Sequence, residues 1–208
     1  MKHQIEVEIR GRIKDFDKTL KEFKDKAKFI GEKDRFSLIY FRHELCKDVK
    51  EIKDEKVDLR LRVTNKKAEM IMKYGQWAGS DSRKEISIPI LLERFDDAVE
   101  FLTCLDWNKG AIMATKTFVF NYKTTEFALV KNDSFNYFEA EKMSNEDNKE
   151  KVMREIKEVC KEFNLEPFDE DDFINQVNAI NNKKENQFDF SKQKFSDIQE
   201  RFKEFFLK

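Results

Sequence analysis

Charged residues alternate with apolar residues in three short segments of this chain. The first reads Ile5-Glu6-Val7-Glu8-Ile9-Arg10, the second Leu59-Arg60-Leu61-Arg62-Val63, and the third Tyr137-Phe138-Glu139-Ala140-Glu141. Because side chains of a β-strand alternate between its two faces, each segment would carry its charges on one face and its apolar residues on the other. Carboxylates hold Mg²⁺ or Mn²⁺, and arginines hold phosphate groups. The segments therefore indicate a site for a divalent metal and a polyphosphate.

The spacing of the acids suits this chemistry, but it does not require it. Two carboxylates two residues apart on a strand lie about 6.6 Å apart along it, so they reach one or two ions from the same side. Phosphoryl transfer needs mainly positioning and electrostatic stabilisation, so a histidine, a cysteine or a glycine-rich loop is not needed. The alternative is a set of solvated sheet faces with cross-strand ion pairs. The pattern alone leaves both interpretations open.

The elements that must position these residues follow from hydrophobic periodicity. Strands are predicted at residues 4–10, 35–42, 57–64, 67–74, 83–90, 111–122, 126–131 and 135–142. Helices are predicted at 16–27, 95–105, 152–163, 169–180 and 195–206; the connections include a turn at 65–66, a turn at 75–82, a charged loop at 44–56 and a linker at 181–190. We expect an α+β fold, an eight-stranded antiparallel β-barrel with flanking helices and a C-terminal helical tail. A barrel of about eight strands can enclose one small ligand.

The composition excludes several classes of function. Of the 208 residues, 40% are charged, yet the net charge is −1, so no overall field attracts nucleic acid or an anionic membrane. No apolar run approaches the roughly 20 residues of a membrane span. The three cysteines are far apart and form neither a zinc motif nor a disulfide framework. We expect a cytoplasmic protein without a membrane or sequence-specific nucleic-acid partner.

The charged segments also resemble the motifs of a known family, the CYTH or triphosphate tunnel metalloenzyme superfamily. This superfamily includes class IV adenylyl cyclases, thiamine triphosphatases and inorganic triphosphatases. Its opening Glu-x-Glu-x-Lys motif is similar to Glu6–Arg10, its LRxR strand to Leu59–Arg62, and its closing FxExE strand to residues 137–141. Its lysine strand and its Arg-x-Glu strand are similar to Met70–Lys73 and Arg83–Glu85. The resemblance implies a tunnel domain at 1–165 that binds a triphosphate with Mg²⁺ or Mn²⁺, and a helical extension at 166–208.

The resemblance also implies roles for single residues. The metal would be held by Glu6, Glu8, Glu139 and Glu141. The phosphates would be held by Arg60, Arg62 and Lys73, with Arg10 and Lys116 as further candidates. Tyr40 matches a tyrosine that pairs with the motif lysine to activate water in thiamine triphosphatases, and Glu85 would be a secondary acid.

Four positions depart from the family pattern. Arg10 stands in place of the motif lysine, and arginine is not deprotonated in proteins, which puts a lysine–tyrosine pair in doubt. The basic cluster of the sixth strand is reduced to Lys116 between two threonines, Val130 replaces an aspartate, and the glycine before the closing motif is missing at 134–136. These departures concern catalysis more than binding.

Three functions fit these residues. The first is a metal-dependent hydrolase of an inorganic, nucleoside or thiamine triphosphate. The second is a class IV-type adenylyl cyclase, in which the ribose 3′-hydroxyl of ATP attacks and pyrophosphate leaves. The third is a protein that binds a triphosphate or nucleotide without turning it over. The tail either plugs one tunnel mouth, which would bring Lys192 or Lys194 to the substrate, or forms a homodimer.

Overall fold

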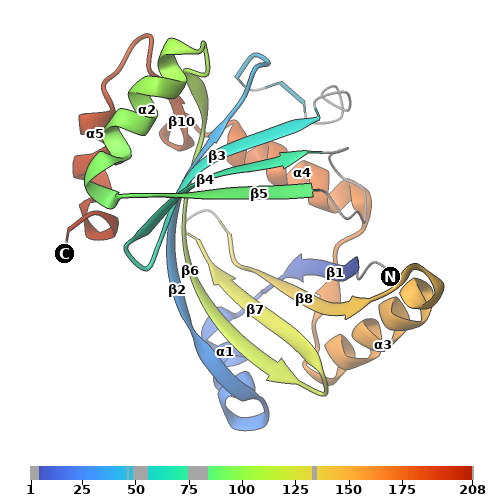
Figure 1. The fold of residues 1–208 in the computed structure, drawn as a ribbon. Coiled ribbons are helices and arrows are strands. Elements are labelled where there is room, and N and C mark those ends of the chain that lie inside the picture. The colour runs from blue at the N-terminus through green and yellow to red at the C-terminus, as the bar shows by residue number, and fades with distance from the viewer. Residues whose placement is uncertain (1–4, 46, 49–55, 75–83, 133–134, 208) are drawn as a thin grey trace. The chain divides into compact units, whose positions relative to one another are not determined.

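The computed structural model describes the chain except for residues 1–4, 46, 49–55, 75–83, 133–134 and 208 (Figure 1). Its strands are β1 (Ile5–Arg12), β2 (Lys28–Tyr40), β3 (Val57–Thr64), β4 (Lys67–Tyr74), β5 (Lys84–Ile90), β6 (Lys109–Tyr122), β7 (Thr125–Lys131), β8 (Tyr137–Ser144), β9 (Glu166–Pro167) and β10 (Gln187–Asp189). Its α-helices are α1 (Phe16–Lys26), α2 (Phe95–Cys104), α3 (Lys149–Glu162), α4 (Glu170–Asn181) and α5 (Phe195–Arg201). Short 3₁₀ turns are η2 (Leu92–Arg94), η3 (Glu146–Asn148), η4 (Lys184–Asn186) and η5 (Lys203–Phe205).

The strands form one ten-stranded sheet in the order β5-β4-β3-β2-β6-β7-β8-β1-β9, and β10 pairs with β6. All eight predicted strands are present as β1 to β8, which confirms the α+β fold with a large antiparallel sheet. Within the described residues the strand order has free ends at β5 and β9. Closure into a barrel therefore remains a prediction.

The chain divides into two compact units. The described residues of the first unit lie within 5–33 and 115–173, and those of the second lie within 34–74, 84–114 and 174–207. Residues of both β2 and β6 contribute to each unit. The expected division at residue 165 stays a prediction.

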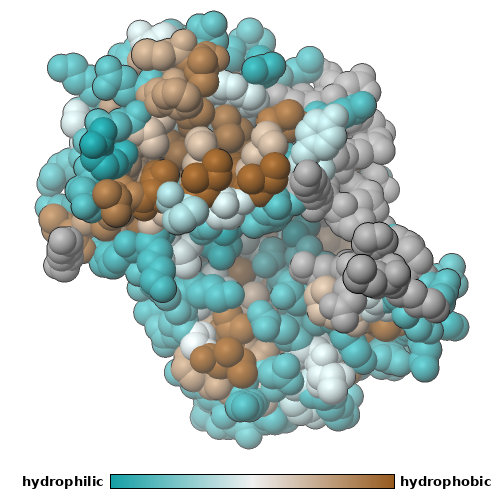
Figure 2. Space-filling model, in the orientation of Figure 1, coloured by the Kyte–Doolittle hydropathy of each residue, from teal (hydrophilic) through white to brown (hydrophobic). Residues whose placement is uncertain are grey.

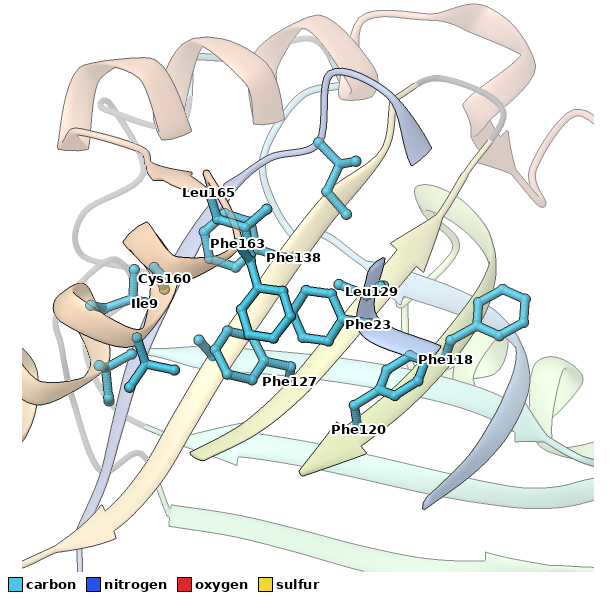
Figure 3. Packing of buried hydrophobic residues seen from close by; sticks show 14 of the residues in the cluster. Ile9, Phe23, Phe118, Phe120, Phe127, Leu129, Phe138, Cys160, Phe163 and Leu165 are labelled. Atoms are coloured by element: carbon cyan, nitrogen blue, oxygen red, sulfur yellow. The ribbon is translucent and has the colours of Figure 1, made fainter. Parts of the chain in front are cut away.

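The core of the first unit is built around aromatic rings (Figure 3). Phe23 of α1 stacks on Phe163 with a centroid distance of 3.9 Å, and it meets Phe127 of β7 edge-on at 5.0 Å. The helix that carries Phe23 begins after Asp15, whose side chain accepts a hydrogen bond from the Lys18 amide at 3.0 Å. This core supports the backs of β1, β7 and β8, so their other faces are available for polar residues.

Gly11 allows β1 to approach its neighbours closely. A Cβ atom at this position would lie 2.2 Å from the Glu166 carbonyl oxygen of β9 and 2.4 Å from the Phe138 ring of β8. Any side chain here would therefore force β9 or the ring away from β1. The glycine keeps β1 in register between its two partners.

The second unit has its own core under β2, β3 and α2. Apolar residues that alternate along β2 and β3 are buried there, and the C-terminal tail adds Phe188, Phe195, Ile198 and Phe202. The phenylalanine stripe of the tail therefore packs against the domain, as its helical spacing predicts. Phe202, for example, lies 5.2 Å from Phe36 of β2, between ring centroids.

Two predicted connections have different outcomes. Asn65 and Lys66 adopt φ angles of 47° and 66°, as a tight hairpin turn with two left-handed residues requires, so that turn is confirmed. The linker prediction at 181–190 is wrong, because residues 187–189 form β10 on β6 and bury Phe188. Two phenylalanines, Phe188 and Phe190, at the end of a polar stretch are too short an alternation to predict a strand; the pairing with β6 supplies the order. The turn at 75–82 and most of the loop at 44–56 lie outside the described residues.

The outer side of β5 is apolar and exposed (Figure 2). Ile86 and Ile88 are 38% and 49% exposed, and they pair in register with Met72 and Met70 of β4. Glu85 and Ser87 of the same strand point to the opposite face. Among the described helices, none is long and apolar enough to cross a membrane.

Candidate functional site

The pairing of β1 with β8 gathers charged residues on one face of the first unit. Glu8 lies opposite Glu141 in the register, and Arg10 lies opposite Glu139. The residues between them, Val7 and Ile9 on β1 and Phe138 and Ala140 on β8, are buried in the core. Glu6 pairs with Met143 through the backbone, but its side chain lies outside the described part of the chain. The structure thus brings Glu8, Arg10, Glu139 and Glu141 together on one face of β1 and β8, which we call the acidic face.

Arg10 joins two of these acids. Its Nη2 atom donates to Glu8 Oε2 at 2.6 Å, and its Nε atom donates to Glu139 Oε1 at 3.1 Å. Burial acts to lower the pKa of Arg10, but the charges of Glu8 and Glu139 outweigh it, so the pKa is raised. Arg10 is therefore a fixed cation and not a general base.

Two further residues lie on the same face: Glu126, which no sequence motif marked, and Tyr137, which lies in the closing motif but was given no role. Glu126 of β7 pairs in register with Glu141, which extends the row of acids to a third strand. Tyr137 shares the face of Glu139, contributes to the electrostatic environment of Arg10, and stacks on Phe135 at 5.1 Å. The sequence pattern that could have identified both residues is alternation: Glu126 stands next to buried Phe127, and Tyr137 stands next to buried Phe138.

The donor atoms on this face suit a hard divalent cation. Glu8, Glu126, Glu139 and Glu141 offer only carboxylate oxygens, which Mg²⁺ and Mn²⁺ prefer. As they stand, no three Asp, Glu, His or Cys side chains in the described part of the chain are grouped closely enough to hold an ion. The guanidinium of Arg10 already shows that a cation fits between two of these acids. A metal would draw the carboxylates together or compete with Arg10.

The second unit has a basic face, built on β2 to β5. The registers place one set of side chains on this face, while Leu59, Leu61 and Val63 point into the core. The basic members are Arg35, Arg60, Arg62, Lys67 and Lys73, and the acidic members are Asp58, Glu69 and Glu85. Among the described residues of this face, five bases against three acids leave a surplus of two positive charges, which favours an anion.

Each predicted phosphate ligand on this face has an acidic partner. Arg60 binds Asp58 through two parallel hydrogen bonds of 2.7 and 2.6 Å. Arg62 lies 2.9 Å from Glu69, and Lys73 lies 2.9 Å from Glu85. An incoming phosphate must therefore exchange with carboxylates that already satisfy these cations.

Glu69 is held as a carboxylate by its neighbours. Burial acts to raise its pKa, but hydrogen bonds from Ser87 and Arg62 outweigh burial and lower the pKa. The acid thus stays charged and orients Arg62. Sequence reasoning missed Glu69, although it alternates with Met70 in the same way as Lys73 alternates with Met72.

Tyr40 lies on the opposite side of the sheet from the basic face. Its ring packs edge-on against Phe188 at 5.1 Å in the core of the second unit, and it is 1% exposed. Its hydroxyl makes no hydrogen bond within the described residues, and burial raises its pKa. A tyrosine in this position does not activate water on the basic face, so we leave Tyr40 out of the proposed site.

Lys116 also lies on the helix-covered side. It pairs in register with Lys131, shares its face with Phe118, and has its Nζ atom 5.4 Å from the centre of that ring. Its Nζ atom lies 3.0 Å from Glu32. Its neighbour Thr117 is the residue that points to the side of the acidic face. The proposed site therefore does not use Lys116.

We expect Tyr40→Phe to leave turnover of any substrate unchanged and to raise the free energy of unfolding by about 1 kcal/mol. The substitution removes a buried hydroxyl that has no hydrogen-bond partner among the described residues, and such a group costs about 1–3 kcal/mol. Steady-state rates and urea unfolding check this. A tenfold loss of turnover without loss of stability would restore Tyr40 to the site.

Comparisons with known proteins relate the chain by fold. The sequence matches no known protein-family model and no curated protein. The PH1819 protein from Pyrococcus horikoshii OT3 has a similar structure, with a TM-score of 0.63 and 19% identity over 83% of this chain and 98% of that one. A candidate adenylate cyclase from Vibrio parahaemolyticus has a TM-score of 0.55 and 17% identity over 78% and 90%. A candidate adenylyl cyclase from Hippeastrum, described as having a dominant triphosphatase activity, has a TM-score of 0.54 and 13% identity over 79% and 90%. These similarities show that the chain shares its fold with these proteins.

Proposed function

We propose that this protein is a divalent-metal-dependent phosphohydrolase that acts on a triphosphate. One observation carries the proposal: the register of β1 and β8 places Glu8, Arg10, Glu139 and Glu141 on one face, over a hydrophobic core. Packing of the apolar faces of β1 and β8 against the core does not require these acids on the opposite face, so stability does not explain their presence. The similarity in fold to a candidate adenylyl cyclase with triphosphatase activity supports this assignment.

The basic face would bind the phosphates. A triphosphate carries about four negative charges, more than the three carboxylates that it would replace around Arg60, Arg62 and Lys73, and arginine binds phosphate through two parallel hydrogen bonds. The surplus of positive charge on this face favours the exchange. In the transition state these cations would stabilise charge that develops on the transferred phosphoryl group.

The acidic face would bind the metal, with Glu8, Glu139 and Glu141 as ligands and Glu126 as a further acid. Glu6 keeps its proposed role through its place in the motif. Bound Mg²⁺ or Mn²⁺ would neutralise phosphate charge and polarise the phosphorus–oxygen bonds. Glu85, paired with Lys73, would orient that lysine. The proposal includes closure of the sheet into an eight-stranded tunnel around the substrate.

A second candidate function is an adenylyl cyclase acting on ATP. One observation favours it: Phe135, just before β8, and Tyr137, at the start of β8, form a stacked, half-buried pair next to Glu139 and Glu141 of that strand. Aromatic side chains of this kind stack on bases, at about 1–3 kcal/mol per base. The similarity in fold to the candidate adenylate cyclase from Vibrio parahaemolyticus agrees with this alternative.

Product analysis by phosphorus NMR distinguishes these functions. The protein is incubated with tripolyphosphate, ATP or thiamine triphosphate, with Mg²⁺ or Mn²⁺, beside the variant Glu139→Gln/Glu141→Gln. We expect orthophosphate and the diphosphate product from the native protein, and none from the variant. The matched control is Glu150→Gln/Glu158→Gln, which removes two exposed acids of α3 and keeps turnover.

Each other outcome has a clear meaning. Pyrophosphate with cyclic AMP would establish the cyclase. Tight binding of a triphosphate without turnover under either metal would establish a binding protein. Equal turnover in both double variants would remove the acidic face from the reaction.

A further inference from the structure

The position of Arg10 has a consequence for metal binding. Its guanidinium takes one oxygen from Glu8 and one from Glu139, through different nitrogens of the same planar group. These two acids are 24% and 28% exposed in their side chains, and Arg10 is 39% exposed, so the contacts are only partly open to water. Such hydrogen bonds between charged groups are stronger than those between neutral groups.

We propose that Arg10 is a built-in cation that competes with a divalent metal for Glu8 and Glu139, and that it thereby sets a low metal affinity for the free protein. The inference rests on the proposed function only in taking these acids as metal ligands. A metal that coordinates both acids must break the two contacts of Arg10 or use the remaining oxygens beside a positive charge. Both routes cost binding free energy.

The side chain at this position matters because arginine and lysine differ in shape. The fork of arginine spans a partner two residues away on β1 and a partner on β8, which is 129 positions away in sequence. Lysine presents a single ammonium group, which bridges two separated carboxylates less effectively. The arginine that departs from the family's motif is thus the feature that allows this bridge.

The competition affects how metal and substrate arrive. Because the free protein binds metal weakly, the metal is expected to enter mainly as its complex with the triphosphate, whose oxygens also offer Arg10 new acceptors. Metal and triphosphate then strengthen each other's binding by the same factor, since coupling between two binding events is reciprocal.

Binding of Mn²⁺ alone tests the inference. The free Mn²⁺ signal in electron paramagnetic resonance is titrated against the native protein, Arg10→Met and Arg12→Met, without any phosphate. Arg12 is the matched control, because it lies two residues further on the same face of β1, is exposed and pairs with Tyr137. We expect Arg10→Met to bind Mn²⁺ about tenfold more tightly than the native protein, and Arg12→Met to change affinity less than about threefold.

Arg10→Lys provides a second variant that keeps the charge and removes the fork. We expect it to bind Mn²⁺ more tightly than the native protein and less tightly than Arg10→Met. Unchanged or weaker binding by folded Arg10→Met and Arg10→Lys would overturn the inference, and so would an equal gain in Arg12→Met. Tighter Mn²⁺ binding without triphosphate turnover would support the inference and count against the hydrolase.

Discussion

Replacing Arg60 by alanine is expected to lower triphosphate turnover about 100-fold, which corresponds to about 2.7 kcal/mol of transition-state stabilisation. Arg60 lies on the basic face and is held in a defined orientation by two hydrogen bonds to Asp58. Its fork is therefore already arranged for a planar, two-point contact, which phosphate also offers. Single-turnover rates measured by phosphate release check this.

The control for this prediction is Arg94→Ala. Arg94 is exposed in η2, pairs with Asp97 and lies outside the basic face, so its loss removes the same charge without the contact. We expect Arg94→Ala to keep the native rate. If Arg60→Ala folds and turns over substrate as fast as Arg94→Ala, β3 has no part in the reaction.

Replacing Phe23 by alanine is expected to cost about 3–5 kcal/mol of unfolding free energy. Phe23 is fully buried, and its ring is stacked on Phe163 and surrounded by Phe120 and Phe127 (Figure 3). The change leaves a cavity between α1, α3 and the sheet, and it removes several aromatic contacts. Urea unfolding followed by circular dichroism measures the loss.

The matched substitution is Phe101→Ala on α2. Phe101 is 60% exposed, so the same atoms are removed from a largely solvated position. We expect a change within about 0.5 kcal/mol. A cost below about 1 kcal/mol for Phe23→Ala would show that the rings of the first core are not tightly packed in solution.

The faces of β1, β3 and β8 were predictable because each strand has one apolar side. Val7 and Ile9, or Leu59 and Leu61, fill every second position, so burial of one face leaves only one place for the charges. The face of β6 was not predictable in this way. Thr117 and Val119 on one side and Phe118 and Phe120 on the other are all buried, so local alternation does not say which side of β6 a helix will cover.

Tyr40 and Lys116 show what alternation decides and what it does not. In β2, Tyr40 shares a face with Phe36 and Leu38, so a period of two already indicates that it faces the core; the structure adds its ring contact with Phe188 of the tail. In β6, Lys116 shares a face with Phe118 and Phe120 by the same rule, and only the packing of those rings against α1 shows that this is the covered side.

The sequence by itself determined that the charged residues of β1, of β3 and of β8 share one face of their strand. A period of two assigns each residue to a face once the apolar side is buried. Only the tertiary structure decided how those charges are paired. Arg10 meets Glu139 because β1 hydrogen-bonds to β8 in one register, and a shift of one residue would turn the acids of either strand into the core. Register between distant strands depends on the whole packed sheet, and no local pattern of residues encodes it.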